Sequence, residues 1–392
     1  MKKLDPADSR LRLGLFYPNT PSIHVTSRAV ADANPDPMEM ATHRAIAQAA
    51  EQIGLDYLFL ADRWAPYDRA STLAHHQDPM LAAFILGAAL IGITERIGII
   101  TTLHTTYFHP AHIARIGANL DRLSGGRWGW NVVTGLTEAE MRMFGFEGEV
   151  EHDRRYEMAV EMIDLVKKLW DGMRREDAWV DWKGKHYTMK GAVVGPGPLQ
   201  APFPLLVNAG ASEAGQRLAA RHCDYLFLTE NSAAAINARM EQTRKQVVAC
   251  GRGPDELSLM TAARVIVRDT QREADEVLNW ITENIDLDAA RAFAAGVMSS
   301  QSIRDAFAGF TDEQVVRAWG GSMDPKAARF CGPPGKVAGE ILSFCRETGC
   351  RGLLLTFPLW HEREIRRFGE QVMPLLAKSG AWIHPSQRDW NW

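Results

Sequence analysis

The amino-acid sequence predicts an α/β protein, a (β/α)8 TIM barrel with insertions after the fourth and seventh strands. The main observation is that short apolar runs rich in β-formers alternate with longer segments of helical periodicity along the 392 residues. This is the order of parallel βα units. A composition of 46% hydrophobic and 23% charged residues supplies a large core. Because barrels extend past about 250 residues as one unit, we expect a single TIM-barrel domain over residues 1–392.

Eight apolar runs of strand length account for the predicted barrel. They are Leu11–Tyr17, Asp56–Ala61, Ile97–Leu103, Trp128–Thr134, Pro204–Ala209, Asp224–Thr229, Ser258–Val267 and Gly352–Phe357. Apolar residues three and four positions apart predict helices between them. These are Ala41–Ile53, Pro79–Ile93, Pro110–Leu123, Asp153–Trp170, Glu213–His222, Ala233–Cys250, Lys336–Glu347 and Glu362–Leu376.

Two stretches are longer than a minimal barrel requires. Residues 171–203 are rich in glycine and proline and predict an excursion with a short hairpin before the fifth strand. Residues 272–334 are partly helical and follow the seventh strand. Because long loops after barrel strands are usually functional, we expect this second insertion to cover the mouth of the barrel.

Charge and cysteine content exclude several classes of function. A net charge of -4 and a pI near 6.3 give no reason to expect nucleic acid or a membrane as partner. The five cysteines form no Cys-x-x-Cys pair, and their odd number argues against a disulfide framework, so we expect a cytoplasmic protein. No apolar core follows the charged start Met1–Pro6, which predicts no signal peptide. The longest apolar stretch, Met80–Ile93, is too short for a membrane span.

Polar side chains interrupt the apolar runs near the ends of the third and fourth predicted strands. The fourth strand carries Asn131 and Thr134, and the third ends with Thr102 and Thr105. Because TIM-barrel active sites lie at the C-terminal ends of the strands, these side chains would share one mouth. For Asn131 alone, a backbone partner explains the residue about as well as a ligand does, and each threonine alone is better explained as a strand former. Their clustering on successive strands favours a ligand-binding role.

A phosphate site is predicted in Leu205–Gly215, where the fifth strand turns into a helix. Small residues there leave backbone N–H groups free at the positive end of a helix dipole, and Ser212 offers its hydroxyl. The alternative is that Ser212 is only the N-cap. Gly210 and Gly215 have P-loop spacing, but Gln216–Arg217 replaces the Lys-Ser/Thr pair. The second glycine of a hydrolase nucleophile elbow is also missing.

The helix after the fourth strand begins with Glu151–Tyr156, whose arginines and phenol suit an anionic ligand. The alternative is an acidic helix start followed by solvated arginines. His104, His109 and His112 match no familiar metal-ligand spacing, so we predict no metal site. The sequence also has no Gly-x-Gly-x-x-Gly fingerprint, which disfavours a Rossmann dinucleotide site.

The segment Ser-Gly-Gly-Arg at 124–127, followed by Trp-Asn-Val-Val-Thr-Gly at 130–135, resembles the bacterial luciferase-like family of flavin monooxygenases. Within that family the chain is similar to the two-component branch that includes pyrimidine oxygenase, dimethylsulfone monooxygenase and alkanesulfonate monooxygenase. The likeness runs from the first strand to the last helix. It includes the start of the helix at 151–156, the turn at 208–212 and the closing strand at 354–357.

The resemblance implies an enzyme that takes reduced FMN from a separate NAD(P)H-dependent flavin reductase and uses it with dioxygen on a small organic substrate. A heterocycle or an organosulfur compound is the implied substrate class. The absence of a cysteine from the second strand argues against an alkanesulfonate. A homo-oligomer, either a dimer or a tetramer, is also implied.

The resemblance further assigns roles to individual residues. Asn131 would contact the flavin ring, and Glu140 would contact the flavin nearby. Thr102 and Asn131 match positions implied for a dioxygen pocket, which makes these two the predicted catalytic residues. The complete set of implied cofactor-binding residues is Asp62, Arg63, Asn131, Glu140, Arg155, Tyr156 and Ser212. In that set Arg155, Tyr156 and Ser212 would hold the phosphate, while Asp62 and Arg63 would border the isoalloxazine.

Three other functions stay open at this point. A hydrolase with Ser212 as nucleophile would need a base within hydrogen-bond reach. A flavin-binding protein without turnover would show no substrate-dependent consumption of dioxygen. A flavin-cleaving lyase of the same family would act on reduced flavin itself.

Overall fold

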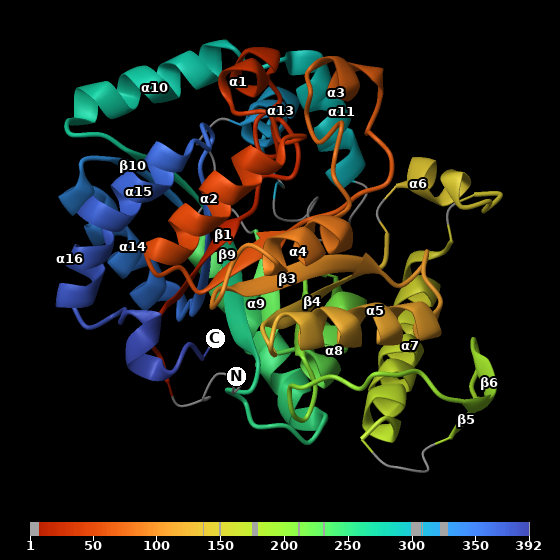
Figure 1. Ribbon diagram of the computed structural model, residues 1–392. Coiled ribbons are helices and arrows are strands. Elements are labelled where there is room, and N and C mark those ends of the chain that lie inside the picture. Colours follow the sequence, from red (N-terminus) through yellow and green to blue (C-terminus); the bar gives the residue numbers. More distant parts are fainter. Residues whose placement is uncertain are drawn as a thin grey trace.

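The structure, a computed structural model, describes residues 8–135, 137–148, 150–174, 179–210, 212–229, 232–298, 307, 309–321 and 328–391. Eight parallel strands close into a barrel in the order β9-β11-β1-β2-β3-β4-β7-β8, and β8 pairs back onto β9. Figure 1 shows the helices around this barrel, with both ends of the chain at its lower side. The predicted (β/α)8 fold is confirmed.

All eight predicted strands are present, with ends that differ from the prediction by at most one residue. They are β1 Arg12–Phe16, β2 Tyr57–Leu60, β3 Gly98–His104, β4 Trp128–Val133, β7 Leu205–Asn208, β8 Tyr225–Leu228, β9 Ser258–Val267 and β11 Gly352–Thr356. Their nearly continuous apolar character follows from burial on both faces of a parallel sheet.

The predicted helices form the outer layer. They are α2 Met40–Gln52, α4 Ala83–Ile91, α5 Pro110–Leu123, α7 His152–Gly172, α8 Glu213–His222, α9 Ala233–Ala249, α14 Pro334–Thr348, α15 Glu362–Gln371 and α16 Met373–Lys378. The last predicted helix, Glu362–Leu376, is in fact two helices. Pro374 lies in the first turn of α16 and has no N–H to donate, so the chain breaks at Val372.

Helix α4 begins at Ala83, four residues later than predicted from Pro79. The N–H of Ala83 donates to the Asp62 carboxylate over 3.2 Å, so a side chain from the end of β2 supplies the cap. Such a cap is invisible in the local sequence because its acceptor lies 21 residues away.

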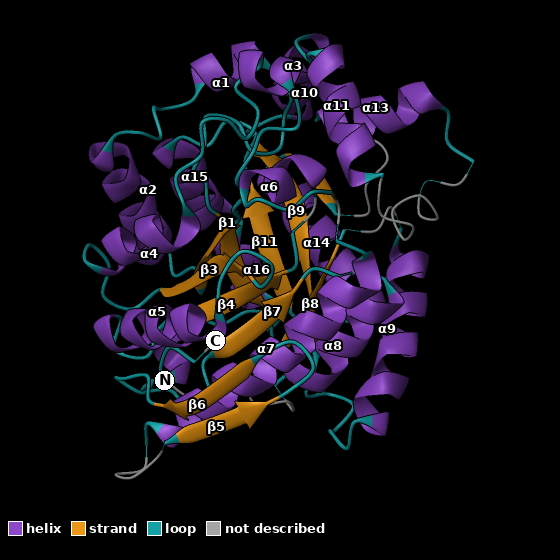
Figure 2. Ribbon diagram, turned by 90° about the vertical axis from the view of Figure 1, so that its right-hand side faces the viewer, coloured by secondary structure: helices purple, strands orange, loops and turns teal. Residues whose placement is uncertain are grey.

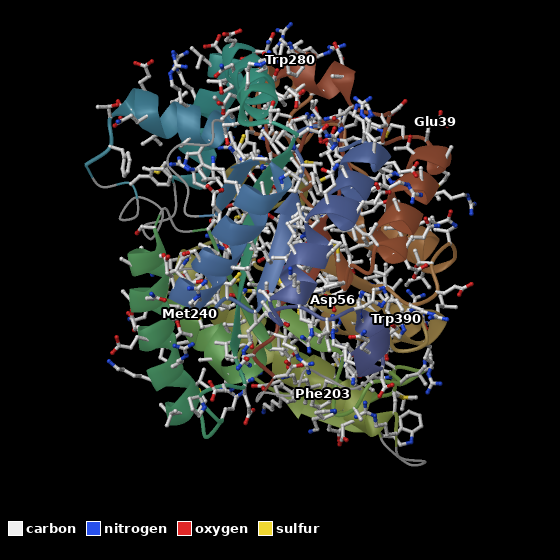
Figure 3. All side chains as sticks on the ribbon, turned by 90° about the vertical axis from the view of Figure 1, so that its left-hand side faces the viewer. Glu39, Asp56, Phe203, Met240, Trp280 and Trp390 are labelled. Carbon is white, nitrogen blue, oxygen red and sulfur yellow. The ribbon has the colours of Figure 1, made fainter. Side chains whose placement is uncertain are left out.

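Both predicted insertions are observed as additions to the barrel. The first contains an antiparallel hairpin of β5 Val180–Lys183 and β6 Thr188–Ala192. The second contains α10 Gln271–Glu283, α11 Leu287–Val297, α13 Asp312–Gly320 and β10 Arg329–Gly332. Figure 2 shows α10, α11 and α13 above the barrel. Figure 3 shows the same arrangement from another side. Trp280 of α10 lies at one end of the molecule, and Phe203, which precedes β7, lies toward the other.

Several short elements were not predicted from the sequence. They are α1 Arg28–Ala33, α3 Arg69–Leu73, α6 Glu138–Met143, strand β10 and the 3-10 turn Pro385–Arg388. Three of them have clear N-caps at Ser27, Asp68 and Thr137, and Thr137 forms a capping box with Glu140. These caps were readable signals, but each helix is too short to show an apolar period.

Among the described residues, a cluster of buried apolar and aromatic side chains fills the interior of the barrel. The interior cluster consists of Tyr57, Phe59, Ile100, Leu205, Val207, Tyr225, Met260 and Leu354. Gly14 is required there, because a Cβ at this position would lie 2.2 Å from the ring of Tyr57. Asp56, directly before β2, pairs with Arg388 of the C-terminal 3-10 turn. Among the described residues, no helix has the length and apolar character of a membrane span.

Candidate active site at the C-terminal end of the barrel

Solvent enters the barrel at the C-terminal ends of the strands. Phe16, Phe227 and Ala262 pack on the interior cluster but are partly exposed, whereas Met260 beneath them is buried. These three side chains, on β1, β8 and β9, form what we call the mouth floor. Helices α3, α11 and α13 lie over this end in Figure 2. The open end is the one where TIM barrels bind their ligands.

Thr102 and Asn131 meet on adjacent strands, paired in register between β3 and β4. The Thr102 hydroxyl donates to the Leu60 carbonyl over 2.8 Å and accepts from Asn131 Nδ2 over 2.8 Å. Because a carbonyl can only accept, this chain fixes the orientation of the Asn131 amide. Asn131 Oδ1 is left as a buried acceptor that has no donor among the described residues. Such an atom is costly unless a ligand supplies an N–H or O–H.

The predicted phosphate turn packs against α7. The hydroxyl of Tyr156 hydrogen-bonds with the side chains of Ser212 and Thr134, and burial raises its pKa, so it remains a donor at neutral pH. Ser212 also caps α8 by accepting from Gly215 N over 3.2 Å. A Cβ on Gly210 would lie 2.5 Å from Tyr156 Oη and 2.8 Å from Gly215 Cα. We call this turn the Gly210 cradle. It requires glycine, the N–H of Gly210 donates to Asn208 Oδ1 over 2.9 Å, and the turn directly precedes the start of α8.

Arg155 precedes Tyr156 on α7 and is buried. Its Nη1 donates to the carbonyl of Gly135 over 3.0 Å, which ties the first turn of α7 to the loop after β4. Gly135 has a φ of +81°, and a Cβ there would lie 2.6 Å from Tyr107 Oη. Arg155 thus both shapes this loop and places positive charge beside the predicted phosphate site.

Asp62 and Arg63 extend from the end of β2 into the mouth. Burial raises the pKa of Asp62 to about 7, hydrogen bonds from the backbone of Ala83 and Arg63 oppose this shift, and the charge of Glu140 adds to it. Arg63 donates from Nε to the Ala65 carbonyl over 2.6 Å, and its guanidinium lies 3.5 Å from the centre of the Tyr67 ring. Asp62 can therefore be protonated near neutral pH.

Glu140 is buried and holds the same region from α6. Its carboxylate accepts from Trp64 N over 3.0 Å and from Thr137 N over 3.2 Å. Trp64 Nε1 in turn donates to His104 Nδ1 over 3.3 Å. Burial lowers the pKa of His104 to about 4, so this ring is neutral at pH 7 with its proton on Nε2. The loops after β2 and β4 are locked together through these contacts.

Sequence reasoning missed Trp64, Tyr107 and Arg264 and considered His104 only as a metal ligand. Arg264 was detectable, because it is a lone cation inside the apolar run Ser258–Val267. Thr105 was also a candidate, but it does not join the Thr102–Asn131 hydrogen bond. Its hydroxyl donates to the Val133 carbonyl over 3.4 Å. It therefore extends the β3–β4 pairing.

Ser212 has no feature of a hydrolytic nucleophile among its described contacts. Its partners are the N–H of Gly215 and the hydroxyl of Tyr156, and neither is a base at neutral pH. A cavity of about 560 Å³ lies at the other end of the barrel, lined by Arg10, Arg346 and Arg351 among others. None of the predicted site residues lines it.

A barrel with polar groups at its strand ends and a glycine cradle opening a helix defines a TIM-barrel protein with a phosphate-suited site at its C-terminal mouth. The chain belongs to the luciferase-like monooxygenase family, which it matches over residues 11–351. The family inferred from the sequence is therefore confirmed.

Three curated relatives illustrate the likeness. Nitrilotriacetate monooxygenase component A of Aminobacter aminovorans is 32% identical over 294 residues, which is 68% of this chain but only 64% of that relative. N-acetyl-S-(2-succino)cysteine monooxygenase of Bacillus subtilis (strain 168) is 28% identical over 95% of this chain and 93% of its own length. Dimethylsulfone monooxygenase of Pseudomonas putida, a member of the branch recognised above, is 28% identical over 86% of this chain and 88% of its own.

Among solved structures, a riboflavin lyase with modified FMN and riboflavin aligns with a TM-score of 0.86 and 29% identity, covering 96% of this chain and 93% of that one. Relatives of this chain thus include both monooxygenases and a flavin-cleaving enzyme.

Proposed function

We propose that this protein is a flavin-dependent monooxygenase that binds reduced FMN at the C-terminal mouth of the barrel and uses dioxygen to oxygenate a small organic substrate. The observation that most supports this proposal is the Gly210 cradle. A single added Cβ would fill it, and the hydroxyls of Tyr156 and Ser212 lie beside it. Backbone N–H groups at a helix start, together with two hydroxyls, suit a phosphate. The reduced flavin would come from a separate NAD(P)H-dependent reductase.

The rest of the site fits the same cofactor. Asn131 Oδ1 is a buried acceptor that needs a donor, and a reduced isoalloxazine offers ring N–H groups. The Gly210 cradle and Asn131 also lie on neighbouring parts of the barrel, as one cofactor would require. The cradle follows β7, and Asn131 lies on β4, which pairs with β7. Asp62 and Arg63 would border the ring from β2. Glu140, whose oxygens already accept from Trp64 and Thr137, would act by fixing the Trp64 segment beside it.

When bound, reduced FMN would supply two electrons to dioxygen, so that one oxygen atom enters the substrate and the other leaves as water. The protein's part is to orient the reactants and to stabilise negative charge on oxygen. We assign that task to Asn131, through the second hydrogen of Nδ2, because the first is donated to Thr102 and Oδ1 can only accept. Thr102 would orient it, because the hydroxyl hydrogen of Thr102 is already donated to Leu60.

The lyase reaction is the second candidate, favoured by the structural likeness to riboflavin lyase. Both candidates need reduced FMN, and they differ in whether free flavin is consumed. Relatives act on compounds as different as nitrilotriacetate and dimethylsulfone, so their names do not select a substrate.

The test is an anaerobic fluorescence titration with reduced FMN, followed by dioxygen consumption with a flavin reductase. Nitrilotriacetate, dimethylsulfone and riboflavin are supplied in turn, and products are identified by mass spectrometry. Saturable binding of reduced FMN and substrate-dependent dioxygen uptake are expected. Loss of riboflavin with appearance of ring fragments would select the lyase, and an absence of saturable binding would contradict both candidates.

A further inference from the structure

Arg264 extends from β9 over the mouth floor. Met260 and Ala262 belong to the barrel interior, and residues two apart on a strand share a face, so Arg264 continues the same face toward the C-terminal end. Its Nη2 donates to the His24 carbonyl over 2.9 Å. The ring of His24 packs edge-on against Phe16 at 4.4 Å, and Phe16 is part of the mouth floor. The guanidinium therefore lies above Phe16 and Ala262.

The surroundings of Arg264 have a low dielectric constant and a positive potential. Burial lowers the pKa of Arg264 to about 10, which leaves it charged at neutral pH. The pKa of buried His76 falls to about 3, chiefly through burial and then through the charges of Arg63 and Arg264. Two guanidiniums therefore act on one enclosed region, in which the histidine is neutral. Coulombic attraction for an anion is much stronger there than in water.

Arg63 adds an unused donor to this region. Its Nη2 is buried and has no hydrogen-bond acceptor among the described residues. The side chain is held by the Ala65 carbonyl and by the Tyr67 ring, so the free nitrogen has a defined direction. A buried cationic N–H without an acceptor costs free energy that a ligand oxyanion would recover.

The remaining walls are apolar and aromatic. In the mouth floor Phe227 stacks on Phe59 at 5.8 Å. Near His76, α11 of the second insertion brings Phe293 to 4.9 Å from the ring of Tyr67 and 4.6 Å from that of His76. A ligand between these walls would bury apolar surface, and the insertion would keep water away from its charged end.

We propose that Arg264, with Arg63 as a second cation, binds an oxyanion of the organic substrate, so that the substrate is a carboxylate or similar anion joined to an apolar body. This inference rests on the proposed function and specifies its substrate class. Strand β9 lies three strands from β4 by way of β8 and β7. The charged end would therefore point away from Asn131, and the apolar body would face the flavin and receive the oxygen atom.

The test compares phenylacetate with its uncharged analogue phenylacetamide by isothermal titration calorimetry. Both flavin-free and FMN-loaded proteins are used, and FMN binding is measured separately, so a failure of the proposed function is distinguishable from a failure of the anion site. Phenylacetate should bind at least about tenfold more tightly than phenylacetamide, because one charge-assisted hydrogen bond is worth that ratio. Equal or undetectable binding of the two probes by both forms would overturn the proposal.

Three variants locate the discrimination. Arg264→Met should reduce the ratio of the two affinities to about one, whereas Arg264→Lys should retain most of it. Arg346→Met, in the cavity at the other end of the barrel, should leave the ratio unchanged. A merely structural role of Arg264 would weaken both probes equally and preserve the ratio, which contradicts the proposal. Loss of the ratio in Arg346→Met would place the anion in the other cavity. Thermal unfolding of each variant checks that it is folded.

Discussion

Replacing Gly210 with alanine should weaken the binding of FMN while leaving the barrel folded. The added Cβ would lie 2.5 Å from Tyr156 Oη and 2.8 Å from both Asn208 Oδ1 and Gly215 Cα, whereas ordinary contact begins at 3.4 Å. The phenol can rotate away, but Gly215 Cα is backbone in the first turn of α8. The turn must therefore open by roughly half an ångström or more, which misaligns the phosphate donors.

The size of the effect follows from the donors that are lost. A hydrogen bond to a charged group contributes about 1.5–3 kcal/mol, and about 1.4 kcal/mol is a factor of ten in Kd. Misaligning one such bond should weaken FMN roughly tenfold to a hundredfold. Riboflavin, which has no phosphate, should bind the variant and the unmodified protein equally weakly.

Fluorescence titration with FMN and riboflavin measures both affinities, and thermal unfolding reports on folding. Gly339→Ala is the matched control, because Gly339 lies within α14 and a Cβ there would meet nothing within 4 Å. That control should leave FMN affinity unchanged and raise stability by about 0.5–1 kcal/mol. A folded Gly210→Ala protein with unaltered FMN affinity would refute the placement of the phosphate.

Three further predictions concern other parts of the mouth. Arg155→Ala should weaken FMN about tenfold or more in the same titration, since it removes a charge and the donor to the Gly135 carbonyl. The Thr102→Val and Asn131→Leu variants should bind FMN with an affinity within a few-fold of the unmodified protein, but they should oxygenate substrate about a hundredfold more slowly and release peroxide instead. Stopped-flow kinetics measures the rate, and product analysis measures the yield. Unchanged rates and yields in both variants would show that the two residues are only structural. Asp62→Asn should change the pH dependence of unfolding in flavin-free protein. The pKa of Asp62 is about 7 in the folded protein and near 3.8 in the unfolded chain. Protonated Asp62 therefore contributes to the free energy of unfolding below pH 3.8, and this contribution is lost as the pH rises to 7. The variant should gain stability relative to the unmodified protein over that interval, and parallel melting curves across pH would contradict the assignment.

The sequence predicted the barrel because each strand and helix carries its own local signal. Ser258–Val267 is apolar over a full strand, and Pro110–Leu123 combines an apolar period with proline at its first position, so both were placed to the residue. Where the prediction was wrong, the causes differed. The start of α4 depends on Asp62, 21 residues away, whereas the break at Val372 follows from Pro374, a local signal that the helical pattern around it masked.

For the site, the sequence by itself determined which polar residues follow which strands, and hence that Thr102, Asn131 and Ser212 belong to one end of the barrel. Only the tertiary structure decided what their atoms can do. The Thr102 proton is donated to Leu60 of a different strand, and Asn131 Oδ1 is left without a donor. Arg264 is enclosed beside the mouth floor by the loop after β1. Hydrogen bonding and desolvation depend on neighbours brought together by closure of the barrel, and residue order along the chain does not contain those distances.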